Sequence, residues 1–114
     1  MSNAVDHDEV DVPMSGDIHD EPYAGSRFDL EPDANGYTFT GIDPLDTAPD
    51  GREIVIVNAS STFSVTLAHD SVSSATGNRL FFSDNADHVL GPHQMVWGLR
   101  ITEVAGRVGW WLQF

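Results

Sequence analysis

Histidine and carboxylate side chains recur near the start of this chain, and these residue types are the ones that could bind a metal ion. The triplet His7-Asp8-Glu9 returns twelve residues later as His19-Asp20-Glu21. Imidazole nitrogens and carboxylate oxygens are good ligands, but a stable site needs a preorganised scaffold. The surrounding segment has scattered apolar residues interrupted by proline and glycine, which is typical of irregular chain. We therefore expect no metal site and no cofactor there.

Two further arrangements could support chemistry. Asp84 and Asp87 could bridge a calcium ion, but the chain has no Asp-x-Asp-x-Asp-Gly calcium loop. His69-Asp70-Ser71 contains the residue types of a nucleophilic triad. Sequence neighbours do not form such a triad, however, and no Gly-x-Ser-x-Gly elbow is present. The sequence thus predicts no catalytic residues, and we do not expect an enzyme.

The charge is concentrated in the first half of the chain. Residues 1–50 hold 13 acidic residues against Arg27 alone, a net charge of -12, whereas residues 51–114 carry -1. This segment repels nucleic acid and anionic membranes, and it favours a protein partner with a basic groove or edge. The chain has no cysteine and no apolar stretch of about 18 residues. Its acidic start is unlike a secretory signal peptide, so we expect no secretion by that route.

The apolar pattern divides the chain at residue 26. Residues 1–26 are predicted to form an extended acidic arm that buries too little to fold alone, so its removal should leave a folded body. From residue 27 the apolar residues alternate, which is typical of half-buried strands. Strands are predicted around 37–40, 54–57, 62–69, 80–82, 89–90, 95–101 and 108–114, with 54–57 central. The pattern of residues 27–114 predicts an all-β fold, a small antiparallel sandwich or barrel of about seven or eight short strands.

Two neighbouring tryptophans lie on the last predicted strand. Alternation is expected to point Val108, Trp110, Leu112 and Phe114 inward and Trp111 outward. An outward tryptophan serves either a contact between subunits or a platform on which a sugar stacks. Because so small a body needs extra burial, we favour the subunit contact.

A series of motifs covers residues 50–114. It runs from Arg52-Glu53-Ile54-Val55-Ile56-Val57-Asn58 through Phe63-Ser64-Val65-Thr66-Leu67-Ala68-His69, Asn78-Arg79-Leu80 and Ala86-Asp87-His88-Val89-Leu90-Gly91-Pro92 to a closing Trp110. This order resembles a β module of bacteriophage structural proteins. In that module a G-R-x-I-x-L-x-N strand is followed by x-I-T-L-x-H/N, A-x-N-R-I/L, A-D-x-x-L-x-P and a last strand that ends in tryptophan.

The resemblance implies a structural protein of the virion. Members of this family occur in tail fibres, spikes and head fibres, often as trimers, and fibre proteins are usually far longer than this chain. We therefore expect a homo-oligomer, a trimer by the resemblance, that acts as a capsid decoration or cement protein on the capsid surface. It would contact the major capsid protein or other virion proteins. A tail, baseplate or fibre-adaptor protein is an alternative. A glycan-binding module that uses Trp111 is another.

The arm and the outward tryptophan are the expected contacts with the shell and with neighbouring subunits. Charge pairs and extended backbone contacts would provide the attachment. The candidate residues are Asp6, Asp8, Glu9, Asp11, Asp17, Asp20, Glu21 and Trp111.

Overall fold

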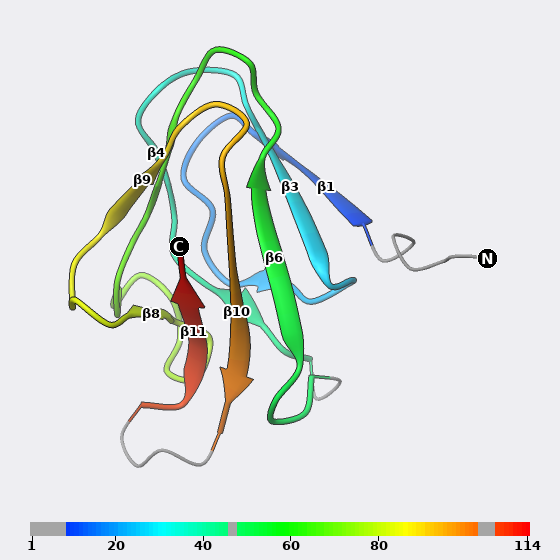
Figure 1. Ribbon diagram of the computed structural model, residues 1–114, viewed down its shortest axis with the longest axis vertical. Coiled ribbons are helices and arrows are strands. Elements are labelled where there is room, and N and C mark those ends of the chain that lie inside the picture. The colour runs from blue at the N-terminus through cyan, green and yellow to red at the C-terminus, as the bar shows by residue number, and fades with distance from the viewer. Residues whose placement is uncertain (1–8, 46–47, 103–106) are drawn as a thin grey trace.

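A computed structural model describes residues 9–45, 48–102 and 107–114. In these ranges the chain forms eleven short strands and no helix, so the predicted all-β class is confirmed (Figure 1). Accordingly, the described residues include no helix that could cross a membrane.

The largest sheet has six strands in the order β1-β3-β6-β10-β11-β8. Their bounds are β1 Glu9–Met14, β3 Arg27–Pro32, β6 Glu53–Asn58, β10 Met95–Ile101, β11 Gly109–Gln113 and β8 Leu80–Phe82. Strand β6 pairs with β3 on one side and with β10 on the other. The central position predicted for residues 54–57 is therefore confirmed.

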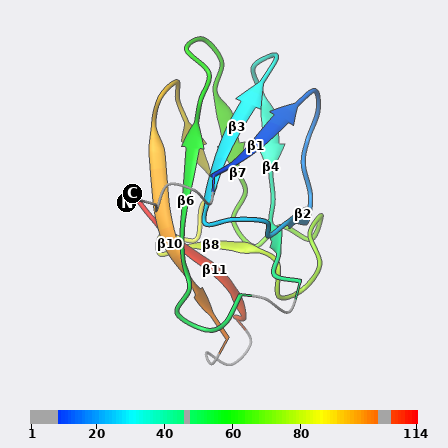
Figure 2. The same cartoon turned by 90° about the vertical axis from the view of Figure 1, so that its right-hand side faces the viewer.

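Two smaller sheets complete the body. One has the order β4-β7-β9 and the other pairs β2 with β5. Their bounds are β4 Tyr37–Phe39, β7 Val65–Leu67, β9 His88–Leu90, β2 Glu21–Pro22 and β5 Ile42–Asp43. The smaller sheets lie on one side of the six-stranded sheet, and the core fills the space between them in the manner of a sandwich (Figure 2).

The sheets are mixed, so the prediction of antiparallel pairing was wrong for much of the molecule. The pairs β1/β3, β3/β6, β8/β11, β4/β7 and β2/β5 are parallel, whereas β6/β10, β10/β11 and β7/β9 are antiparallel. An alternating sequence shows which side chains share a face of a strand, but it does not show which strand lies beside it or in which direction. The structure has four strands beyond the seven predicted ranges: β1 and β2 in residues 9–26, β3 directly after them, and the two-residue β5.

The N-terminal segment contributes to the common core. Val12 and Met14 of β1 are 2% and 1% exposed, and they pack in the same cluster as the body. Further along, the Tyr23 ring stacks on that of Trp110, with centroids 5.7 Å apart. The Asp17 carboxylate accepts a hydrogen bond from the Thr38 backbone N–H at 2.9 Å. Residues 9–26 thus form an integral part of the sandwich.

Polar contacts fasten the same segment to the loop that follows β7. Asp20 has a φ of 53°. Its carboxylate accepts hydrogen bonds from the Ala75 N–H and the Asn78 side-chain amide, both at 2.9 Å. Its own N–H donates to the buried Ser74 hydroxyl at 3.2 Å. An acidic residue that was expected to contact a partner is therefore an internal structural link.

The last strand follows the predicted alternation except at its end. Trp110 and Leu112 are buried, at 0% and 5% exposure, and Trp111 lies on the opposite face. Phe114, by contrast, is 56% exposed, so its assignment to the core was wrong. Strand β11 ends at Gln113, which leaves Phe114 outside the ladder. There its ring stacks against Phe82 at the margin of the sheet, with centroids 5.8 Å apart.

Two methionines test whether the N-terminal segment is structural. We expect Met14→Ala to lower the free energy of unfolding by about 3 kcal/mol, because it opens a cavity in the core. Met95 is 60% exposed, so Met95→Ala should change it by less than about 0.5 kcal/mol. Urea denaturation followed by tryptophan fluorescence measures both values. Equal and small effects of the two substitutions would show that β1 does not pack as described.

Candidate functional site

The side of the six-stranded sheet that faces away from the core, here called the outer face, is the candidate site. The strand register places outward side chains in three rows that cross the sheet, because paired residues project to the same side. The rows are Glu9-Arg27-Val55-Trp97-Gln113, Asp11-Asp29-Val57-Met95 and Glu53-Leu99-Trp111-Phe81. Carboxylates gather over β1 and β3, and apolar side chains gather over β6, β10 and β11.

The apolar part of the outer face is open. Trp97 is 48% exposed and Met95 60% exposed, while their neighbours Val55, Leu99 and Trp111 are half-buried. Trp97 lines a hollow on each of its two sides. In Figure 2 the strands of the smaller sheets lie on the opposite side of the large sheet. The outer face thus presents two tryptophans and a methionine to the surroundings.

Strand β10 turns its larger apolar side chains outward because the inward side is filled from β11. Gly98 pairs with Leu112, whose side chain occupies the space beside it: a Cβ at Gly98 would lie 2.7 Å from Leu112 Cδ2 and 2.1 Å from the Trp111 carbonyl oxygen. Arg100 pairs with Trp110 and places its guanidinium 5.1 Å from the centre of that buried ring. The sequence grouped Met95, Trp97, Leu99 and Ile101 on one face, and the structure identifies it as the outer one.

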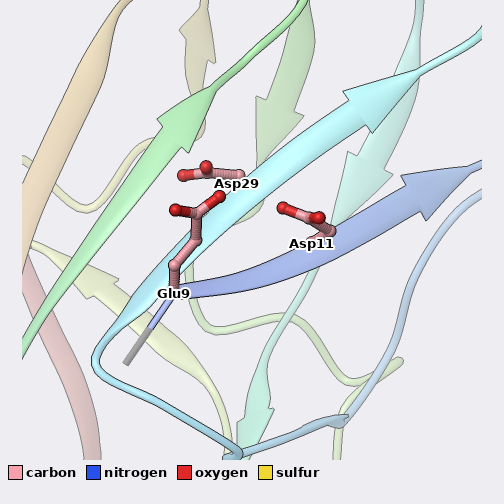
Figure 3. A group of neighbouring side chains, drawn as sticks. All are labelled: Glu9, Asp11 and Asp29. Carbon is pink, nitrogen blue, oxygen red and sulfur yellow. The ribbon is translucent and has the colours of Figure 1, made fainter. Parts of the chain in front are cut away.

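Three carboxylates meet at the other part of the outer face (Figure 3). Glu9 and Asp11 of β1 and Asp29 of β3 each place a ligand oxygen within 4.8 Å of those of the other two. Asp29 is only 5% exposed, and the Arg27 guanidinium donates to both of its oxygens, at 2.8 and 3.0 Å. Hydrogen bonding with Asp29, and then with Asp11, raises the pKa of Glu9 above its ordinary value. The cluster forms because β1 lies parallel to β3 in this register.

These carboxylates have the chemistry to hold a hard divalent cation such as Ca²⁺, which prefers six to eight oxygen ligands. Among the described residues this is the one group of three metal-ligating side chains so close together. Both Asp29 oxygens already accept hydrogen bonds from Arg27, which competes with an ion. A bound cation would have to displace the Arg27 guanidinium from Asp29.

The structure divides the predicted contact residues into two groups. Glu9, Asp11 and Trp111 lie on the outer face, although they are about 100 residues apart in the chain. The Trp111 ring packs on Phe81 at 5.6 Å, and its N–H donates to the Arg107 carbonyl at 3.0 Å. Trp111 is therefore positioned from both sides while part of it stays accessible.

The other predicted contact residues that the structure describes lie away from the outer face. Asp17 and Asp20 bind backbone and side-chain groups of their own chain, as described above. Glu21 is half-buried in β2, and this burial raises the pKa of its carboxyl. Asp6 and Asp8 lie outside the described residues. Sequence reasoning missed Trp97 and Asp29, which the outer face adds.

His69, Asp70 and Ser71 have the residue types of a nucleophilic triad, but their side chains do not form one. The His69 Nδ1 atom accepts a hydrogen bond from the Phe82 backbone N–H at 2.9 Å. Asp70 forms an ion pair with Arg79 at 3.4 Å. The Ser71 hydroxyl oxygen accepts a hydrogen bond from the Ser73 N–H at 3.2 Å. Each of the three side chains thus serves its own part of the fold.

The other candidate ligands are also held apart. Asp84 lies 2.9 Å from the His88 imidazole, and this hydrogen bond is the main reason why its pKa is lowered. Asp87 instead accepts a hydrogen bond from the His69 N–H at 2.7 Å. In the second acidic triplet, His19 Nδ1 lies 2.7 Å from the Thr40 hydroxyl. These contacts tie loops and strands together.

The chain matches no protein-family model, no curated protein and no solved structure.

The carboxylate cluster predicts a pH-dependent stability. The pKa of Glu9 is raised in the folded state, so folding favours the protonated carboxyl. The contribution of Glu9 to the free energy of unfolding is therefore complete below its ordinary pKa of 4.5, and it is lost as the pH rises through the pKa of the folded state. Glu9→Gln keeps a neutral side chain at every pH. We expect it to raise the urea midpoint at pH 7 and to match the parent chain below about pH 4.5.

Glu31→Gln is the matched control, since Glu31 is an exposed acid of β3 on the same face. It removes one negative charge but leaves the three carboxylates in place. If both substitutions raise the midpoint equally, general charge explains the effect and the local cluster does not.

Proposed function

We propose that the protein is a structural component of a bacteriophage virion, a capsid decoration or cement protein, that binds the shell through its outer face. A binding role, and not an enzymatic one, fits this surface. The observation that carries the proposal is the exposure of Trp97 and Met95 amid half-buried apolar neighbours. A contiguous apolar patch of this kind marks an interaction site, and aromatic residues and methionine are enriched in interfaces.

The virion assignment is supported by where its motifs lie. The residues that resemble the phage β module coincide with β6, β7, β8, β9 and the start of β11. They are thus distributed over both layers of the sandwich, as expected for motifs that specify a fold. Under this proposal the protein is a homo-oligomer, a trimer by the resemblance, and its acidic N-terminal part lies near neighbouring subunits or the major capsid protein. The same surface would serve a tail, baseplate or fibre-adaptor protein.

Glycan binding is the second candidate, and one observation favours it. The hollow between Trp97 and Trp111 has aromatic walls, and its lining includes the polar side chains of Ser83 and Gln113. Aromatic rings provide stacking surfaces. A sugar site also needs several converging polar groups, whereas this hollow is lined mostly by apolar side chains. The lining therefore fits a protein partner better.

Localisation on particles tests the proposal. An antibody against the chain should detect it in purified virions of the phage that encodes it, at a constant amount per particle. Electron microscopy should then place the label on the capsid. Label on the tail would favour the adaptor alternative, and absence of the chain from purified particles would refute the virion assignment.

Substitutions on the outer face test how the protein attaches. We expect the double variant Met95→Ser/Trp97→Ser to stay folded, because neither side chain belongs to the core, and to lose particle binding by at least about 30-fold. Val72 is 86% exposed and lies outside the six-stranded sheet, so Val72→Ser is the matched control. Co-sedimentation with particles that lack the native protein measures both. Equal binding of the two variants would exclude the outer face as the attachment surface.

A further inference from the structure

Trp97 separates two hollows of different chemistry on the outer face. The first, here called the apolar hollow, includes Phe81, Leu99, Ile101 and Trp111 in its lining. The second, here called the acidic hollow, is lined by Ser26, Glu53, Ile54, Val55 and Trp97. Because Trp97 lines both hollows, a ligand that fills both must cross its ring.

The surroundings of the acidic hollow are strongly negative. Glu53 is exposed, and none of the ion pairs among the described residues involves it. The outward carboxylates of β1, β3 and β6 are Glu9, Asp11, Asp29, Glu31 and Glu53. The outward base on these strands is Arg27, which forms an ion pair with Asp29. A positive group from a partner would therefore be attracted to this part of the face.

We propose that the outer face binds a protein segment in which an apolar residue is followed or preceded closely by an arginine or lysine. The apolar residue fills the apolar hollow. The basic side chain lays its aliphatic stem across the Trp97 ring and brings its charged end toward Glu53, an arrangement that combines cation–π and ion-pair attraction. The identity of the partner as a virion protein rests on the proposed function, whereas the chemistry of the segment does not.

Strand spacing limits how far apart the two anchors can be. Neighbouring strands lie about 4.8 Å apart, so hollows on the two sides of β10 are separated by roughly 10 Å. An extended chain covers that distance in about three residues. The apolar and basic residues should therefore be about three positions apart in an extended partner segment.

Charge disfavours a second copy of this chain as the occupant. The outward charges on β1, β3 and β6 are five carboxylates and one arginine, and that arginine is already paired. A copy of the same face would bring more carboxylates and no free base from these strands. A partner of opposite charge satisfies Glu53, and a second copy does not.

Selection from a random-peptide display library on the full chain tests the proposal. We expect enriched peptides to share an apolar or aromatic residue about three positions from an arginine or lysine. Trp97→Ser should weaken the binding of such a peptide by at least about 30-fold, as for interface hot spots. Glu53→Gln should weaken it about threefold, and the difference between parent and variant should shrink in 0.5 M NaCl. Val72→Ser, which changes an exposed residue outside the six-stranded sheet, is the control and is expected to bind like the parent chain.

Several outcomes would overturn the proposal. These are a failure to enrich peptides, enrichment without a basic residue, or binding that Trp97→Ser leaves unchanged. A glycan array is probed in parallel, and glycan binding that is lost in Trp97→Ser while no peptide binds would assign the apolar hollow to a sugar. The selection uses the isolated chain and not the virions examined in the localisation experiment, so the two results are independent.

Discussion

The buried indole of Trp110 joins parts of the chain that are far apart in sequence. Its N–H donates to the Ile42 carbonyl at 2.8 Å, and Tyr23 stacks against its ring. The Arg100 guanidinium also lies over this ring, at 5.1 Å. One side chain with no exposed surface therefore contacts the N-terminal segment, β5 and β10. The packing of this one side chain therefore links all three elements.

This arrangement also determines what the outer face presents. Successive residues of a strand point to opposite sides, so Trp110 in the core requires Trp111 on the outer face. On the paired strand, Gly98 and Arg100 occupy the inward positions beside Leu112 and Trp110. Trp97 is consequently outward. The core packing of β10 and β11 thus produces the exposed tryptophans, and any partner that uses them depends on that packing.

Much of the strand pattern could be predicted from the sequence. The continuous apolar run at residues 54–57 and the alternation at 95–101 and 108–114 identified strands. The alternation also identified the residues that share a face, except at Phe114. Strand β1 was missed, although Val10, Val12 and Met14 alternate with polar or conformationally restricted residues. The acids and Pro13 suggested an irregular arm, but both are acceptable in an edge strand, where one side needs no partner.

The candidate site was less predictable because it depends on pairings between distant segments. The cluster of Glu9, Asp11 and Asp29 exists only because β1 lies parallel to β3. Nothing in the local sequence specifies that register. Likewise, Trp97 and Trp111 were each assigned to a face of a strand, but only the antiparallel pairing of β10 with β11 places them in the lining of one hollow. Side-chain alternation is local information, whereas a surface is a property of the assembled sheet.

The acidic side chains of β1 affect whether a partner strand can add along that edge of the six-stranded sheet. Strand β1 is one edge of the six-stranded sheet, where an incoming strand could otherwise add. Its outward Glu9 and Asp11, together with Pro13, which lacks an N–H, oppose such an addition. The opposite edge, β8, is only three residues long. Addition of a strand along β1 is therefore disfavoured, whereas the apolar centre of the outer face stays open to contact.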